Sequence, residues 1–397
     1  MINPEGKSKI KQLPEHLIDQ IKAGEVVERP SSLLKELLEN SLDANSSKIE
    51  IEIEDNGLTF LSVQDNGTGM CYEDLTPAFT RHSTSKIIRF EDIYNLNSFG
   101  FRGEALASIS SISRLTCHTY PQDSVQGGKI IIHGGEIISQ LPLEVSKHNH
   151  GTKIYIRDLF YNTPARLKFI KSKISEKQSI KKIIESFIIS NPTVFFSVKW
   201  DDKEKKIYGP DLSRDFIKRT NEILLKGKKQ SEHNLISFEQ SYQGYSLKCI
   251  LSLRSNTNNR NKSQYIFVNG RLIKNKQFHH IILKSMHSHW ESNASGDYVL
   301  TYNVPGQSID PNVHPQKTEI KFLKTEIPFS LLSSGIKKNI PQYHQKNDKH
   351  SEPPLKESND LFNNALHREH LPSHVQTQKF SSSTFLENQY KSYIPLT

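Results

Sequence analysis

The segment of residues 29–43 constrains the fold more than any other, because it predicts an amphipathic helix. Its apolar stripe consists of leucines spaced three or four residues apart: Leu34, Leu37, Leu38 and Leu42. Pro30 suits the first helical turn, where its missing N–H has no helical partner, and Ser31 or Ser32 is the expected cap. The chain must therefore supply a core against which one face of this helix can pack.

A second stripe of the same helix is polar. Glu36, Asn40 and Asp43 follow helical spacing, so their side chains project side by side. A carboxylate one turn from an amide could act as a base beside a metal ligand. For this helix alone, a solvated polar face is the favoured interpretation of the pattern.

Two strands are predicted directly after this helix. Residues 48–54 alternate isoleucine with charged residues, which is typical of a half-buried strand, and residues 55–57 read Asp-Asn-Gly, a strong hairpin signal. The next strand, residues 59–64, runs into Asp65, which shares a face with Val63. Asp65 therefore points toward the apolar side, where a carboxylate is costly unless it accepts hydrogen bonds.

Asp65 has two interpretations. The exocyclic amine of an adenine could donate to its carboxylate, and Gly67 and Gly69 would let a flat base approach the backbone. Alternatively, residues 65–67 are a solvated Asp-Asn-Gly turn. The second glycine and the strand phase favour the first interpretation.

Residues 80–86 are polar and suit a mobile lid, and Gly100 and Gly103 open a further helix. Free backbone N–H groups at such a helix start can bind phosphate, although many helices begin after glycine for no functional reason. The segment is not a P-loop, because no Gly-Lys-Ser/Thr follows.

The remaining pattern predicts three parts: residues 1–205, residues 206–338 and a disordered tail at residues 339–397. A short amphipathic helix is expected at residues 16–23. The other expected helices lie at residues 73–79, 175–190, 214–225 and 272–290. Further strands are expected at residues 112–119, 129–133, 136–141, 152–157, 194–198, 235–239, 245–253, 264–268 and 298–304.

Composition bounds the function class. The 397 residues contain 52 Lys and Arg against 43 Asp and Glu, a net charge of +9, which fits a polyanionic partner. The three cysteines are isolated, so neither a disulfide framework nor a zinc site is predicted. The polar start and the lack of a long apolar run predict a cytoplasmic protein without a membrane partner.

Taken together, the motifs resemble a known superfamily. Four stretches resemble the four motifs of the GHKL ATPases. They are Glu36-x-x-x-Asn40, Asp65-x-Gly67-x-Gly69, residues 100–106 and Gly151-Thr152. Residues 23–30, 100–111, 158–166 and 267–271 resemble the MutL/PMS mismatch-repair branch. The resemblance spans about residues 10–335 and implies an α+β fold. That fold is a GHKL (Bergerat-type) ATPase α/β sandwich followed by a smaller ribosomal-S5-like α/β domain.

The resemblance implies ATP and Mg²⁺ as cofactors and gives residues roles. Glu36 matches the general base, Asn40 the Mg²⁺ ligand and Asp65 the adenine-binding carboxylate, with Thr152 behind it. The glycines bordering the base are Gly67 and Gly69. The lid and the triphosphate loop correspond to Thr84, Ser85, Lys86, Gly100, Phe101, Arg102, Gly103, Glu104, Ala105 and Leu106.

Three basic residues complete the implied roles. Lys317 matches a lysine that reaches the γ-phosphate from the second domain, although alone it would be an ordinary surface lysine. Arg166 and Arg271 match positions that contact the DNA backbone, and a generic basic face is the alternative for them.

The resemblance implies a weak Mg-dependent ATPase that acts as a matchmaker in DNA mismatch repair. Its expected partners are a MutS-type mismatch sensor, a repair nuclease or helicase, and double- or single-stranded DNA bound without strong sequence preference. An ATP-dependent N-terminal homodimer is also expected. Because the chain ends at Thr397 in linker-like sequence, the alternative is an ATPase-bearing DNA-binding scaffold that no longer cycles, since its C-terminal dimerisation domain is missing. A topoisomerase subunit or chaperone should lack the mismatch-repair stretches.

Overall fold

The computed structural model describes residues 27–86, 99–100, 103–123, 126–144, 150–170, 172–211, 216–225, 234–255, 262–291, 294–310 and 320–340, together with residues 18 and 24. Apart from residue 18, the helix expected at residues 16–23 lies outside these residues. The tail lies outside them from residue 341 onward.

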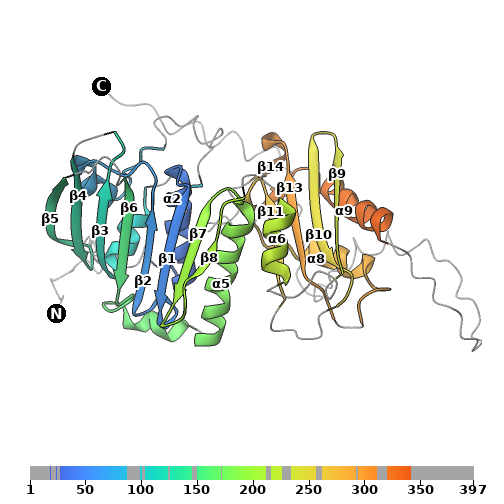
Figure 1. The fold of residues 1–397 in the computed structure, drawn as a ribbon, viewed down its shortest axis with the longest axis horizontal. Coiled ribbons are helices and arrows are strands. Elements are labelled where there is room, and N and C mark those ends of the chain that lie inside the picture. The colour runs from blue at the N-terminus through green and yellow to red at the C-terminus, as the bar shows by residue number, and fades with distance from the viewer. Residues whose placement is uncertain are drawn as a thin grey trace, which may run out of the picture. The chain divides into compact units, whose positions relative to one another are not determined.

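Eight strands form the first sheet in the order β5-β4-β3-β6-β2-β1-β7-β8, as Figure 1 shows. They are β1 (Lys48–Glu54), β2 (Phe60–Asp65), β3 (Arg114–Tyr120), β4 (Gln126–His133), β5 (Glu136–Glu144), β6 (Gly151–Arg157), β7 (Phe195–Trp200) and β8 (Lys206–Tyr208). Neighbouring strands pair antiparallel except β1 and β7, which are parallel.

The strand pattern of the sequence is confirmed in the first hairpin. Ile49, Ile51 and Ile53 of β1 are fully buried, while the charged residues between them are partly exposed. The connecting turn η1 (Asp55–Gly57) places Asn56 at a φ of 56°, a left-handed conformation that asparagine tolerates. This turn fixes the register that brings Asp65 opposite Ile49.

Helices pack on one face of the first sheet. They are α2 (Pro30–Asp43), α3 (Leu75–Ala78), α4 (Ala105–Ser111) and α5 (Lys173–Ser190). Two short 3-10 turns also belong to this part of the chain, η2 (Tyr72–Asp74) and η4 (Pro164–Phe169). The leucine stripe of α2 joins one apolar cluster with the isoleucines of β1 and of α5. The apolar residues that follow the 3.6-residue helical period and those that follow the two-residue strand period therefore pack in one core.

A second sheet has the order β12-β11-β13-β10-β9. Its strands are β9 (Leu235–Tyr242), β10 (Tyr245–Ser252), β11 (Gln264–Val268), β12 (Arg271–Leu272) and β13 (Tyr298–Asn303). The accompanying elements are α6 (Phe216–Leu225), α8 (Lys276–Ser285), α9 (Glu326–Asn339), η6 (Gly306–Ser308) and the pair β14 (Ile309–Asp310) with β15 (Lys321–Phe322). None of the helices within the described residues has the length and apolar character needed to cross a bilayer.

The helix predicted at residues 272–290 is wrong in its bounds. Leu272 pairs with Phe267 in a short antiparallel ladder, so the chain is extended there. The helix α8 begins only after Asn275, whose side-chain oxygen accepts hydrogen bonds from the N–H groups of Gln277 and Phe278. The helix α9 was not expected, and it contributes Leu331, Leu332 and Ile336 to the second core.

The two sheets share part of their packing. Ile250, Tyr265, Phe267 and Val299 of the second sheet belong to the apolar cluster of the first. The other face of the second sheet packs separately with α8 and α9. Both sheets lie in one compact unit ending at Tyr343. The boundary expected between residues 205 and 206 stays a prediction.

Candidate functional site

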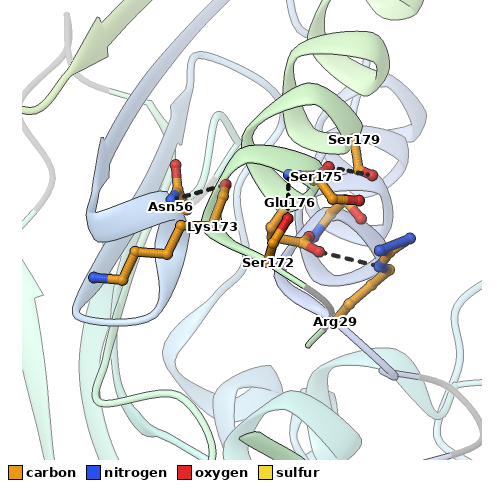
Figure 2. Close-up of polar contacts among 8 residues, drawn as sticks. Arg29, Asn56, Ser172, Lys173, Ser175, Glu176 and Ser179 are labelled. Carbon is orange, nitrogen blue, oxygen red and sulfur yellow. Dashed lines mark hydrogen bonds and ion pairs between the residues drawn. The ribbon is translucent and has the colours of Figure 1, made fainter. Parts of the chain in front are cut away.

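The helix α2 is held at its start by a residue of another helix. Its N-cap, Arg29, makes no side-chain capping bond, so the expected cap at Ser31 or Ser32 is wrong. Instead, Glu176 of α5 accepts hydrogen bonds from the Ser31 N–H at 3.0 Å and from Arg29 Nε at 3.1 Å. The Glu176 side chain is only 1% exposed, and Figure 2 shows it directed at Arg29. A buried carboxylate thus satisfies a backbone donor that the helix itself leaves unpaired.

The start of α5 is itself well ordered by local contacts. Ser172 caps the helix, because its Oγ accepts from the Ser175 N–H at 3.1 Å. The Asn56 side chain donates to the Lys173 carbonyl at 3.2 Å, which connects the first hairpin turn to α5 (Figure 2). The hairpin, α5 and α2 therefore form one connected framework.

The polar stripe of α2 lines a cavity of about 910 Å³. The predicted site residues around it are Glu36, Asn40, Asp65, Gly69, Thr84, Ser85, Lys86, Gly100, Gly103, Glu104, Ala105, Leu106 and Thr152. Segments that are distant in sequence thus line the same cavity. The roles that the resemblance implies for these residues stay predictions.

Asp65 lies at one side of this cavity, at the end of β2. Its Oδ1 accepts from the N–H groups of Gly67 at 2.9 Å and Thr152 at 3.3 Å, and its Oδ2 accepts from Ser41 Oγ at 2.9 Å. Burial raises the pKa of the Asp65 carboxyl, and these donors oppose the shift. The carboxyl is therefore fixed in orientation in a place where an unsupported charge would be unfavourable.

A threonine pair supports the Asp65 corner from behind. Thr119 Oγ1 lies 3.0 Å from Thr152 Oγ1 and accepts from the Met70 N–H at 2.8 Å. Gly69 has a φ of +66°, and a Cβ there would collide with the carbonyl of Tyr120. Only glycine fits this close approach of two backbones.

Asp43 ties two loops to the end of α2. Its carboxylate accepts from Lys86 Nζ at 2.6 Å and from the N–H groups of Phe99 at 2.9 Å and Gly100 at 3.3 Å. The helical spacing places Asp43 on one stripe with Glu36 and Asn40, but the sequence gives it no role in the site.

Lys86 lies between two oxygen acceptors of α2. Besides Asp43, its ammonium group donates to Asn40 Oδ1 at 3.1 Å. The structure thus favours positive charge beside the Asn40 amide oxygen. Oxygen ligands are also what Mg²⁺ prefers, so the donor set fits such a cation. Within the described residues no cluster of three His, Cys, Asp or Glu could hold a metal, so Mg²⁺ would need ligands from a bound phosphate and from water.

Glu36 lies one turn before Asn40 and is 25% exposed toward the cavity. Lys35 Nζ is 3.7 Å from Glu36 Oε1 and 2.9 Å from Glu39 Oε1. Burial lowers the pKa of Lys35, but the carboxylates of Glu39 and Glu36 outweigh burial, so the net shift is upward. A firmly protonated lysine therefore accompanies the candidate base.

The other predicted residues are placed differently. Phe101, Arg102 and Lys317 lie outside the described residues. Gly67 does not line the cavity but donates its N–H to Asp65.

The two predicted DNA-contacting arginines lie outside the cavity lining. Arg166 belongs to η4, and burial lowers the pKa of its guanidinium. Arg271 of β12 lies over the ring of Phe99, 5.9 Å from its centroid, and therefore close to a loop that borders the cavity.

Two protein families match the chain. A family described as histidine kinase-, DNA gyrase B- and HSP90-like ATPase matches residues 28–152, and the family "DNA mismatch repair protein, C-terminal domain" matches residues 225–340. The DNA mismatch repair protein MutL of Elusimicrobium minutum is 38% identical over 82% of this chain and 52% of its own length. MutL of Thermosipho africanus is 39% identical over 85% of this chain and 56% of its own length. The chain thus spans about half the length of these curated relatives.

Solved structures agree with the fold. The MutL ATPase domain of Aquifex aeolicus complexed with ADP is 26% identical, with a TM-score of 0.54 over 80% of this chain and all of that chain. The N-terminal domain of a DNA repair protein is 22% identical, with a TM-score of 0.63 over 80% of this chain and 96% of that chain, which shows a shared fold.

Replacing Glu176 tests how α2 is anchored. Glu176→Gln removes the charge that holds Arg29 and weakens the cap on Ser31, so we expect the free energy of unfolding to fall by about 1.5–3 kcal/mol. Urea unfolding measures this. The exposed carboxylate Glu204 provides the control, because Glu204→Gln should change stability by less than about 0.5 kcal/mol. Equal stability of both variants would contradict the anchoring role.

Replacing Asp43 tests the connection between α2 and the loops. In the wild-type chain the Phe99 N–H donates to one carboxylate oxygen of Asp43 and the Gly100 N–H to the other. The Asp43→Asn variant keeps only one acceptor oxygen, so the Phe99 and Gly100 amides should exchange with solvent about 10- to 100-fold faster. Hydrogen exchange measures this directly. Glu36→Gln lies on the same stripe and should leave these two amides unchanged. Unaltered exchange in Asp43→Asn would show that other groups hold the loop.

Proposed function

The chain belongs to the MutL family of DNA mismatch repair proteins, as its ATPase portion, and from this premise we propose that it binds ATP with Mg²⁺ and hydrolyses it slowly to ADP and phosphate. The observation that carries the proposal is the arrangement of Asp65. Its carboxyl is fixed by three donors at one side of a cavity whose other side carries Glu36 and Asn40.

The adenine end of the nucleotide would meet Asp65. With Ser41, Gly67 and Thr152 already donating, the remaining lone pairs of the carboxyl suit the exocyclic amine of adenine. Ionised Asp65 would accept this bond, whereas guanine offers a carbonyl oxygen at the corresponding position. The base would therefore be selected by one fixed acceptor.

The phosphate end would meet the polar stripe of α2. Asn40 would hold Mg²⁺, which when bound neutralises phosphate charge, and Glu36 would orient the attacking water as general base. Lys86 supports the proposal, since its ammonium group already contacts Asn40 and Asp43 and could exchange those contacts for a phosphate oxygen.

The loops of residues 84–86 and 100–106 would close over the triphosphate. Gly103 has a φ of +62°, and a Cβ there would collide with the Ser83 carbonyl, so the two loops pack with their backbones in contact. The His82 N–H also donates to the Gly103 carbonyl at 3.1 Å. Phe101, Arg102 and Lys317 would add contacts to the phosphates, as the family resemblance implies.

The biological role we propose is that of an ATP-dependent matchmaker in the cytoplasm. It would couple a MutS-type mismatch sensor to a repair nuclease or helicase, through DNA backbone contacts and an ATP-dependent N-terminal homodimer. The net charge of +9 supports the DNA contacts. Arg271, which lies over Phe99, would connect DNA to the loop at the nucleotide cavity.

Two α2 variants separate binding from turnover. Glu36→Ala should keep ATP affinity and lose about 10²- to 10⁴-fold in phosphate release, because a positioned base contributes that much. Asn40→Ala should lose Mg·ATP binding. Calorimetry and a phosphate-release assay measure the two effects. Turnover of Glu36→Ala equal to that of the unmodified chain would refute the base assignment. Nucleotide binding without any turnover in the unmodified chain would favour the non-cycling scaffold.

DNA binding should depend strongly on salt and weakly on sequence. We expect Arg271→Ala to reduce the slope of log affinity against log salt by about 1, equally for unrelated sequences. Fluorescence anisotropy with labelled duplexes at several salt concentrations measures this slope. The exposed Lys218 of α6 supplies the control variant Lys218→Ala. Affinity indifferent to salt would contradict backbone recognition.

A further inference from the structure

The face of the first sheet opposite the cavity carries a concentration of positive charge. On β3, β4 and β6, alternate residues such as Cys117, Ile130 and Ile154 are buried against the helices. The residues between them point to the other face. The basic residues among these outward positions are Arg114, His118, Lys129, His133, Lys153 and Arg157. We call this group the basic sheet face.

The strand register places these basic side chains directly opposite one another. Arg114 faces Arg157 across β3 and β6, and His118 faces Lys153 on one side and Lys129 on the other. Like charges in directly opposed positions destabilise a sheet. Burial, followed by the charges of Lys129 and Lys153, lowers the pKa of His118, which reflects this crowding.

Few carboxylates compensate the basic sheet face. Asp158 lies 3.6 Å from Arg114, and both side chains are about half exposed. Within the described part of the chain, Lys129, Lys153 and Arg157 have no carboxylate within ion-pair distance. On β1 the arrangement differs, because Glu50 is paired with both Lys48 and Lys205. The basic residues of β3, β4 and β6 are therefore less balanced by carboxylates than Lys48 of β1 is.

Aromatic rings lie among these cations. The Tyr155 ring of β6 occupies the centre of the face, with His118 at 5.6 Å in an edge contact and Lys153 Nζ at 4.8 Å. The Arg157 guanidinium covers the ring of Phe60 at 4.8 Å, and that of Arg114 covers Tyr161 at 5.0 Å. Flat rings and flat guanidinium groups are the surfaces on which unpaired bases stack.

We propose that the basic sheet face binds a single-stranded nucleic acid. Its phosphates would contact the Lys and Arg side chains, and one of its bases would stack on Tyr155. An open sheet that presents aromatic and basic side chains suits a strand whose bases are free, whereas a duplex keeps its bases stacked inside. Charge complementarity identifies the partner as a polyanion, and the central tyrosine identifies it as one with exposed rings.

This proposal is independent of nucleotide chemistry. Thr152 and Ile154 of β6 line the cavity, while Lys153 and Tyr155 of the same strand lie on the opposite face. It shares with the proposed function only the expectation that the chain binds nucleic acid. It assigns this contact to a surface other than Arg166 and Arg271.

The test uses the full 397-residue chain without nucleotide and a fluorescent 20-residue oligothymidine, with anisotropy measured over a salt series. The double variant Lys129→Gln/Lys153→Gln should reduce the slope of log affinity against log salt by about 1.4, which is 0.7 for each lost phosphate contact. The double variant Lys218→Gln/Lys338→Gln removes the same charge from exposed helix positions and should leave the slope unchanged. Equal slopes for both double variants would overturn the proposal.

Variants of Tyr155 test stacking. Tyr155→Ala should weaken oligothymidine binding about 5- to 100-fold, whereas Tyr155→Phe should preserve it. Tyr155→Leu fills the site with an apolar side chain but has no ring, so we expect it to bind oligothymidine as weakly as Tyr155→Ala. It serves as the test if the alanine variant does not fold, and thermal melting shows which variants are folded. An equal loss on a 20-base-pair duplex, or full binding by Tyr155→Leu, would overturn the assignment to single strands.

A nucleotide-binding measurement separates this proposal from the proposed function. Each sheet variant should bind ATP as the unmodified chain does, because the cavity lies on the other face. If the unmodified chain fails to bind ATP but the sheet variants lose oligothymidine binding, the proposed function fails and this inference holds. If only Arg166 and Arg271 variants lose oligothymidine binding, this inference fails and the proposed function stands.

Discussion

The start of α2 is held by a single buried carboxylate that belongs to another helix. Glu176 accepts from the Ser31 N–H and from Arg29, so α5 fixes where α2 begins. Burying a carboxylate is costly unless charged and backbone donors compensate it, and here both are present. Because a helix is stiff, fixing its start also fixes Glu36, Asn40 and Asp43 further along. The geometry of the cavity therefore begins with a contact outside the cavity lining.

The same helix α5 also reaches the second sheet. Its Glu185 accepts a hydrogen bond from the hydroxyl of Tyr265 in β11, and both side chains are buried. Tyr265 and Phe267 join the apolar cluster of the first sheet. One rigid element is thus in contact with the start of α2 and with a strand that leads toward Arg271. The structure provides a continuous packed connection between the candidate nucleotide cavity and the second sheet.

The sequence predicted those features that depend on local periodicity. The strand β1, its hairpin turn and the inward phase of Asp65 follow from a two-residue period, and the α2 stripes follow from a 3.6-residue period. Contacts between distant residues that no motif marks were not predictable. The α2 cap comes from a residue 145 positions away, and the amides bound by Asp43 lie 56 and 57 positions away. The helix α8 was predicted too long, because pairing of Leu272 with Phe267 outweighs helical pattern.

The sheet tolerates crowded positive charge because one of its faces is buried against the helices and the other is exposed. Leu115, Cys117, Ile154 and Ile156 are almost fully buried on the inner face, and burying each large apolar side chain contributes about 1.5–3 kcal/mol. An opposed like-charge pair on the outer face costs only about 0.2–1 kcal/mol. The inner face therefore stabilises the strands by a wide margin. Arg114 and Arg157 can therefore remain opposite each other without threatening the fold, and Arg157, which has no ion pair among the described residues, keeps its charge available to a polyanion.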